Sequence, residues 1–149
     1  MAQEIRRVVV GPDGDGGVAV RRDGPAPAQV ELPAVPGTTL TDLWRSDEVP
    51  LPPPGDDDPT EAEFALMPPG ALFRVIDLGP TGDAEPMWHR TASVDCIYIA
   101  TGTATLLHEG GEVDVAAGDT VVVGGVTHAW VNRGDGPCRL VNTSIALAG

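Results

Sequence analysis

The sequence predicts an all-β protein of the jelly-roll class, with a strand-rich N-terminal arm in front of a small antiparallel barrel. Short segments rich in Val, Ile and Thr follow one another from residue 71 onward. The segments between them contain Gly, Pro or Asp, which favour turns. No segment has the 3.6-residue periodicity of an amphipathic helix. About seven strands within 77 residues are typical of an antiparallel barrel or sandwich.

The N-terminal arm is predicted to add strands to the barrel and to cover one of its ends. Its expected strands lie at residues 5–10, 17–21 and 38–45. A Pro-rich crossing is expected at residues 25–36, and residues 50–59 are too rich in Pro and Asp to pair in the middle of a sheet. The sequence has no internal repeat. We therefore predict one domain, with residues 1–70 as the arm and residues 71–149 as a single barrel.

The barrel strands are predicted from apolar and β-branched segments bounded by turn residues. They are expected at residues 71–78, 88–100, 103–108, 112–115, 120–123, 128–132 and 138–147.

Two His and one Asp are the residues with the clearest chemical potential. His89, Thr91 and Asp95 have the same parity in one predicted strand, so a regular strand turns all three to one face. His128 belongs to a different strand of the same barrel. Two imidazoles and a carboxylate that converge inside a barrel form a site for a divalent metal with open positions for substrate.

The spacing of these residues resembles the cupin superfamily. Its first motif runs H-x-H, three or four residues, E, six residues, G, and this chain has His89, Thr91, Asp95 and Gly102 at those positions. Its second motif begins with Gly and ends H-x(3)-N, which corresponds here to residues 118–132, closing with His128 and Asn132. The resemblance covers about a third of the chain tightly and about half of it loosely, and it implies the jelly-roll barrel of that superfamily.

The chain departs from the motifs at three points. Thr91 replaces the second His, Asp95 replaces Glu, and the Pro expected shortly before the second-motif His is absent. Asp has one methylene fewer than Glu and so about 1.5 Å less reach. The resemblance then implies a metal set of His89, Asp95 and His128, to which Fe, Zn, Mn or Ni would all fit. The alternative is a pair of buried imidazoles that bind no metal and are satisfied by hydrogen bonds.

The function that the resemblance implies is a metal-dependent lyase or isomerase acting on a small oxygenated acid or keto compound. Asp95 is the candidate catalytic residue, as a metal ligand, as an acceptor for the N–H of a metal-binding His, or as a general base. One alternative is a non-haem Fe(II) dioxygenase. A second alternative is a cupin that binds a small molecule without catalysis.

Three further residues are candidates for substrate binding. Thr91 shares the face of His89, and Trp130 shares the parity of His128. For Trp130, the role of a core aromatic that closes one end of the barrel is an equal alternative. Arg74 is a possible anchor for a substrate carboxylate if it faces inward.

The composition restricts the partners. With 22 acidic and 9 basic residues the net charge is -13, so nucleic acid is not an expected partner. No apolar segment is long enough to span a membrane, and the N-terminus lacks the apolar region of a secretory signal. Two Cys in such a chain are expected to be free thiols. We predict a cytoplasmic protein with a small-molecule substrate, and the resemblance implies a homodimer.

Overall fold

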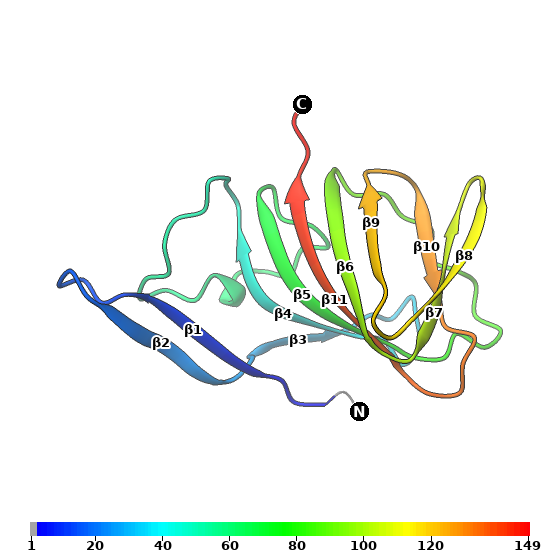
Figure 1. The fold of residues 1–149 in the computed structure, drawn as a ribbon, viewed down its shortest axis with the longest axis horizontal. Helices are drawn as coiled ribbons and strands as arrows, with labels where there is room; N and C mark the ends of the chain where they lie inside the picture. The colour runs from blue at the N-terminus through cyan, green and yellow to red at the C-terminus, as the bar shows by residue number, and fades with distance from the viewer. Residues whose placement is uncertain (1–2) are drawn as a thin grey trace.

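The computed structural model describes residues 3–149 and is all-β, which confirms the predicted fold class (Figure 1). One 3₁₀ turn, η1 (Pro59–Glu61), interrupts the strands. No helix in the described part of the chain is long and apolar enough to cross a membrane. The strands are β1 (Arg6–Pro12), β2 (Val18–Pro25), β3 (Ala28–Glu31), β4 (Thr39–Ser46), β5 (Ala71–Leu78), β6 (Ser93–Thr101), β7 (Thr103–His108), β8 (Gly111–Ala116), β9 (Thr120–Gly124), β10 (His128–Val131) and β11 (Cys138–Ala146).

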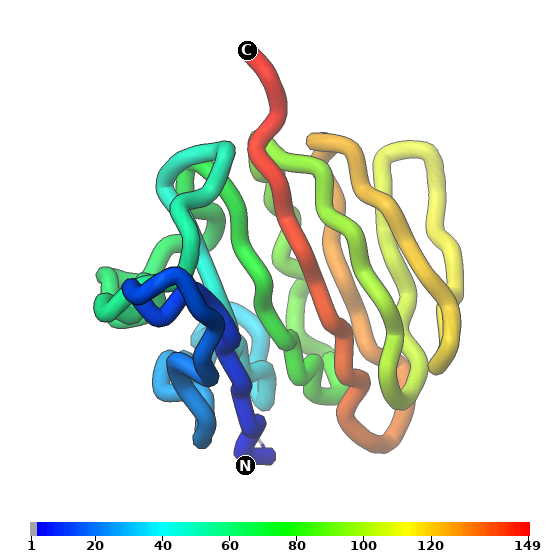
Figure 2. The backbone as a smooth tube through the Cα atoms, turned by 60° about the vertical axis from the view of Figure 1, so that its left-hand side comes forward, coloured from blue at the N-terminus to red at the C-terminus, as the bar shows by residue number. Residues whose placement is uncertain are grey.

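Two antiparallel sheets form the barrel. The larger has the order β3-β4-β5-β11-β6-β9, and the smaller has the order β10-β7-β8. Figure 2 shows β11 between β5 and β6. Buried side chains of both sheets form one core cluster, with Ile99 and Leu140 from the larger sheet and Leu106 and Val115 from the smaller. Burying each such side chain stabilises the fold by about 1.5–3 kcal/mol.

The hairpin of β1 and β2 forms a separate two-stranded sheet that extends to one side in Figure 1. It is attached through Arg7, whose buried guanidinium binds Asp58 and donates to the carbonyl oxygen of Leu43 and to Thr60 Oγ1. Burial alone would raise the pKa of Asp58, but hydrogen bonds from Arg7 and Thr60 lower that pKa to about 2. Asp58 is therefore a charged partner for Arg7 across the neutral pH range.

The structure differs from the predicted strands in two places. Residues 28–31 form β3 inside the predicted Pro-rich crossing. This strand lies at the edge of the larger sheet. Pro residues are tolerated there because an edge strand pairs with a neighbour on one side only. The strand predicted from residue 88 begins regularly only at Ser93, and His89 before it pairs in an isolated bridge with His128.

Two motif residues have structural roles. Asn132 is almost fully buried, and its amide nitrogen donates to the carbonyl oxygens of Leu78 and Gly136. Gly102 has φ +78°, and a Cβ there would lie 2.7 Å from the carbonyl oxygen of Pro137. Both residues tie the turns at one end of the barrel to the sheet.

A buried ion pair joins β4 to β5. The side chains of Arg74 and Asp42 are both buried, and Arg74 Nη2 donates to Asp42 Oδ2 at 3.1 Å. The same guanidinium donates to the carbonyl oxygens of Ala65 and Leu66 and stacks over the Phe64 ring at 5.0 Å. These bonds hold residues 64–66, which precede β5, against the side chain of Arg74 on β5.

We predict that Arg74→Met lowers the free energy of unfolding by about 3–5 kcal/mol, because it leaves the Asp42 carboxylate buried without a partner. Urea denaturation followed by tryptophan fluorescence measures the loss. The double variant Arg74→Met/Asp42→Leu should recover most of it. The matched control, Arg6→Met, breaks the exposed pair with Asp23 and should leave the transition almost unchanged. A similar loss in single and double variants would contradict this prediction.

Candidate functional site

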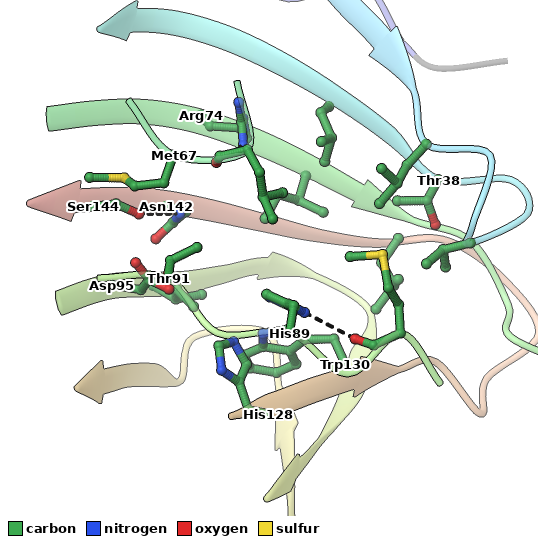
Figure 3. A pocket seen from close by; sticks show the side chains of 18 residues that line it. Thr38, Met67, Arg74, His89, Thr91, Asp95, His128, Trp130, Asn142 and Ser144 are labelled. Atoms are coloured by element: carbon green, nitrogen blue, oxygen red, sulfur yellow. Dashed lines mark hydrogen bonds between the residues drawn. The ribbon is translucent and has the colours of Figure 1, made fainter. Parts of the chain in front are cut away.

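One cavity of about 90 Å³ brings together all six candidate residues of the sequence analysis (Figure 3). It lies inside the barrel, and its wall is mostly apolar. The candidate residues on its wall are Arg74, His89, Thr91, Asp95, His128 and Trp130. The apolar part of the wall comprises Leu32, Val35, Leu40, Leu66, Met67, Ile76, Leu78, Met87, Ile97 and Trp130.

The two imidazoles lie side by side. His89 and His128 exchange two backbone hydrogen bonds, of 2.9 and 3.0 Å, in an isolated antiparallel bridge. Side chains of directly paired residues stand on the same face of a sheet and close together. The ring centroids are accordingly 4.4 Å apart, with the planes tilted by 56°. His128 is only 2% exposed, whereas His89 is partly buried.

The hydrogen bonds of the rings define their tautomers. His89 Nδ1 lies 3.0 Å from the carbonyl oxygen of Met87, and His128 Nδ1 lies 2.8 Å from that of Val126. A carbonyl oxygen only accepts, so each Nδ1 carries the proton and donates it. In a neutral imidazole the other nitrogen, Nε2, then has a free lone pair. Each ring therefore offers one basic nitrogen.

The environment keeps His128 neutral. Burial is the largest influence, and it lowers the pKa of His128 because it disfavours the charged imidazolium. The neighbouring His89 lowers this pKa further, whereas the hydrogen bond to Val126 and the Asp95 carboxylate partly oppose the shift. A neutral His128 at pH 7 is able to accept a proton.

Asp95 lies at the end of a chain of hydroxyl groups. Ser93 Oγ donates to Asp95 Oδ1 at 2.7 Å, and Thr91 Oγ1 lies 2.8 Å from Ser93 Oγ. Because the Ser93 proton is directed at the carboxylate, Thr91 is the donor in the second bond. In Figure 3, Asp95 and Thr91 lie near Asn142 and Ser144, apart from the paired rings.

The predicted metal set of His89, Asp95 and His128 stays a prediction. Among residues 3–149 there is no group of three or more His, Cys, Asp or Glu side chains that could hold a metal ion. His89 and His128 are together, but Asp95 does not complete a ligand group with them. The carboxylate of Asp95 accepts a hydrogen bond from the Ser93 hydroxyl. The residues present do not fit a metal held by three side chains.

Arg74 faces the cavity, but four of its five N–H groups are occupied by Asp42 and two backbone carbonyls. It has little capacity left to bind the carboxylate of a substrate. Trp130 is partly buried, lines the cavity beside the imidazoles and packs against the core cluster. It therefore combines the two roles that the sequence left open, a core aromatic and a wall of the cavity.

Asn142 and Ser144 on β11 also line the cavity, and the sequence analysis did not identify them. Asn142 Nδ2 donates to Ser144 Oγ at 2.9 Å, and Ser144 is paired with Asp95 on β6. The signal for these residues was their parity. Asn142 and Ser144 lie on either side of exposed Thr143 and on the same face of β11 as fully buried Leu140. Two polar residues at positions that face the core are a signal for a polar site inside the barrel.

Comparison with known proteins gives a match to one family model. Residues 74–144 match the family model described as Cupin domain. The chain is 41% identical over 68 residues to the Oryzines biosynthesis cluster protein J of Aspergillus oryzae (strain ATCC 42149 / RIB 40), a match that covers 45% of this chain. The same match covers only 37% of that protein, so this chain spans little more than a third of its relative.

Two solved structures have a similar fold. A putative ethanolamine utilization protein q from Salmonella typhimurium LT2 superposes with a TM-score of 0.58, over 99% of each chain, at 11% identity. The polyketide cyclase RemF from Streptomyces resistomycificus superposes with a TM-score of 0.54 at 20% identity, over 78% of this chain and 70% of that chain. At these identities the similarity shows the fold alone.

We predict that His128 makes stability depend on pH. Its folded-state pKa lies below the ordinary value of about 6.5, so the unfolded chain binds the proton more readily. Stability is therefore fully present above pH 6.5 and decreases as the pH falls from 6.5 through the folded-state pKa, by at most about 1.4 kcal/mol per pH unit.

The measurement is urea denaturation of the parent chain and His128→Gln between pH 7.5 and 5.5. The free energy of unfolding of His128→Gln should depend less steeply on pH than that of the parent chain. His108→Gln is the matched control, because His108 is exposed at the β7–β8 turn. An equal slope in His128→Gln and the parent would contradict this assignment.

Proposed function

We propose, from the premise that residues 74–144 of this chain are a cupin domain, that the protein is a small-molecule enzyme of the lyase or isomerase type. Its substrate is a small oxygenated compound bound in the barrel cavity. The observation that carries the proposal is the pair of imidazoles on the cavity wall, each with its proton on Nδ1 and a basic Nε2. A mostly apolar wall surrounds this pair, and a neutral imidazole there is suited to general acid–base catalysis.

His128 is the proposed general base, since its lowered pKa keeps it neutral at pH 7. Its Nε2 accepts a proton from a carbon adjacent to a carbonyl group. The electron pair of that C–H bond forms the C=C bond of an enolate, and the negative charge moves to the carbonyl oxygen. His89, in contact with the charged ring, is the proposed partner for relaying the proton.

Two reaction types follow from this intermediate. In an α-hydroxyketone, the hydroxyl proton on the carbon that was deprotonated passes to the enolate oxygen, and return of the proton from His128 to the former carbonyl carbon completes an isomerisation. Transfer of the same proton to a hydroxyl group on the β-carbon releases water and completes a dehydration, which is a lyase reaction. In both cases the imidazole returns to its neutral form, and no oxidant is needed. We therefore favour this chemistry over the dioxygenase alternative.

The relationship to a fungal biosynthesis cluster protein supports a role in small-molecule metabolism. Cupin domains often bind metals, and a metal in such a domain would polarise a carbonyl oxygen. Because the described residues form no three-residue ligand group, no step of the proposed reaction depends on a metal. Homodimerisation and a cytoplasmic location stay predictions.

We predict that His128→Gln reduces the exchange of carbon-bound protons by about 10²–10⁴-fold, the usual contribution of a general base. The full-length chain is incubated in D₂O with a set of small hydroxyketones, and ¹H NMR measures the loss of the proton next to the carbonyl group. His89→Gln should also lower the rate. His108→Gln serves as the matched control and should exchange at the parent rate.

Metal dependence is tested in the same assay. We expect the parent chain to keep its rate after treatment with EDTA and to hold less than one metal ion per chain. Loss of exchange in EDTA, together with a stoichiometric metal that disappears in His89→Ala, would overturn the metal-free mechanism. Binding of hydroxyketones without any exchange would identify the chain as a binding protein.

A further inference from the structure

We infer that the cavity selects a neutral molecule with a hydroxyl or N–H donor and excludes carboxylates, and that Asp95 and Asn142 make this selection. The inference rests on the proposed function and narrows its substrate class. From the sequence, an oxygenated acid or a keto compound is the expected substrate. Selection against carboxylates excludes the acids and leaves hydroxylated keto compounds and their enols as candidate substrates. The evidence is the hydrogen bonding at the end of the cavity away from the paired imidazoles.

Asn142 has an unused acceptor in this part of the cavity. Its side chain is 7% exposed, and Nδ2 is occupied by Ser144 Oγ. Its Oδ1 is buried and has no hydrogen-bond partner among the described residues. Figure 3 shows this oxygen directed away from Ser144, toward the side on which Thr91 and Asp95 lie. A buried acceptor without a donor destabilises the protein, so it marks a position where a ligand donor is favoured.

Asp95 adds a second acceptor on the same side. It is 8% exposed, and the described hydrogen bonds occupy only Oδ1, through Ser93. The hydroxyl chain from Thr91 runs toward this carboxylate, so the protons of Thr91 and Ser93 are already used. A carboxylate and an amide oxygen on one side of a cavity call for a donor from the ligand.

No cation on the cavity wall is free to hold an anionic ligand. Among the eighteen described residues that line it, Arg74 is the only Arg, and it is already paired with Asp42. His128 is buried, which lowers its pKa and favours the neutral imidazole. A ligand carboxylate would therefore meet the charge of Asp95, which is 8% exposed, and like charges repel more strongly at a buried position than in water.

The remaining wall selects the body of the ligand. Leu40, Ile76, Met87 and Ile97 contribute apolar surface to the cavity wall. The cavity volume of about 90 Å³ limits the body to a single small ring or a short chain. Such a molecule would have its donor beside Asp95 and Asn142 and its apolar body against these side chains.

The test uses three probes of similar size: phenol, anisole and benzoate. Anisole has the phenolic O–H capped by a methyl group, and benzoate carries a negative charge. Dissociation constants are measured by ¹H–¹⁵N NMR titration of the full chain at pH 7.5. Phenol should bind about 2- to 13-fold more tightly than anisole, the equivalent of one net hydrogen bond. Benzoate should bind at least about tenfold more weakly than phenol.

Two variants assign the selection to residues. Asn142→Leu should lower the phenol-to-anisole ratio, because only Asp95 can then accept from the phenol O–H, while anisole binds as it does to the parent chain. Asp95→Asn should remove most of the penalty for benzoate. Thr143→Val, on the outer face of the same strand as Asn142, is the matched control and should keep the selectivity of the parent. If Asn142→Leu does not fold, Asp95→Asn with benzoate tests the inference independently.

Equal binding of the three probes to the parent chain would overturn the inference, because an ordered water molecule would then satisfy the two acceptors. Benzoate binding as tightly as phenol would overturn it as well. Neither outcome affects the exchange assay with His128→Gln. Conversely, selective binding of phenol without proton exchange in hydroxyketones would contradict the proposed reaction but support the inferred class of ligand.

Discussion

The backbone bridge between His89 and His128 is the contact on which the candidate site depends. It connects the segment before β6, in the larger sheet, with the first residue of β10, in the smaller sheet. Its two hydrogen bonds bring together residues that are far apart in the sequence and turn both rings to one side. Because each ring also donates from Nδ1 to a backbone carbonyl two residues earlier, the rotation of both rings is restricted.

The polar groups of the barrel interior differ in how completely they are paired. Arg74 is surrounded by a carboxylate, two carbonyl oxygens and an aromatic ring, and its role is to hold β4, β5 and the preceding segment together. Asn142 and the imidazole Nε2 atoms instead retain unused acceptors on the cavity wall. A fold tolerates an unpaired buried group at a considerable cost, and such groups are concentrated where a ligand completes them.

The fold was predictable from local pattern. Gly-, Pro- and Asp-containing turns separated the β segments, and the parity of His89, Thr91 and Asp95 indicated one inward face. The burial pattern of β6 follows this alternation, with Ser93, Asp95, Ile97 and Ile99 buried. β3 was not predicted, because Pro residues flank it and an edge strand needs partners on one side only.

The sequence by itself determined the all-β class, the family resemblance and the inward set of His89, Thr91, Asp95 and His128, since these depend on spacing along the chain. Only the tertiary structure decided which of them meet. It paired the two imidazoles, separated Asp95 from them, engaged Arg74 with Asp42 and directed Asn142 into the cavity. The reason is physical: parity defines the face of a strand, whereas strand order and register define which side chains on that face come within hydrogen-bond distance.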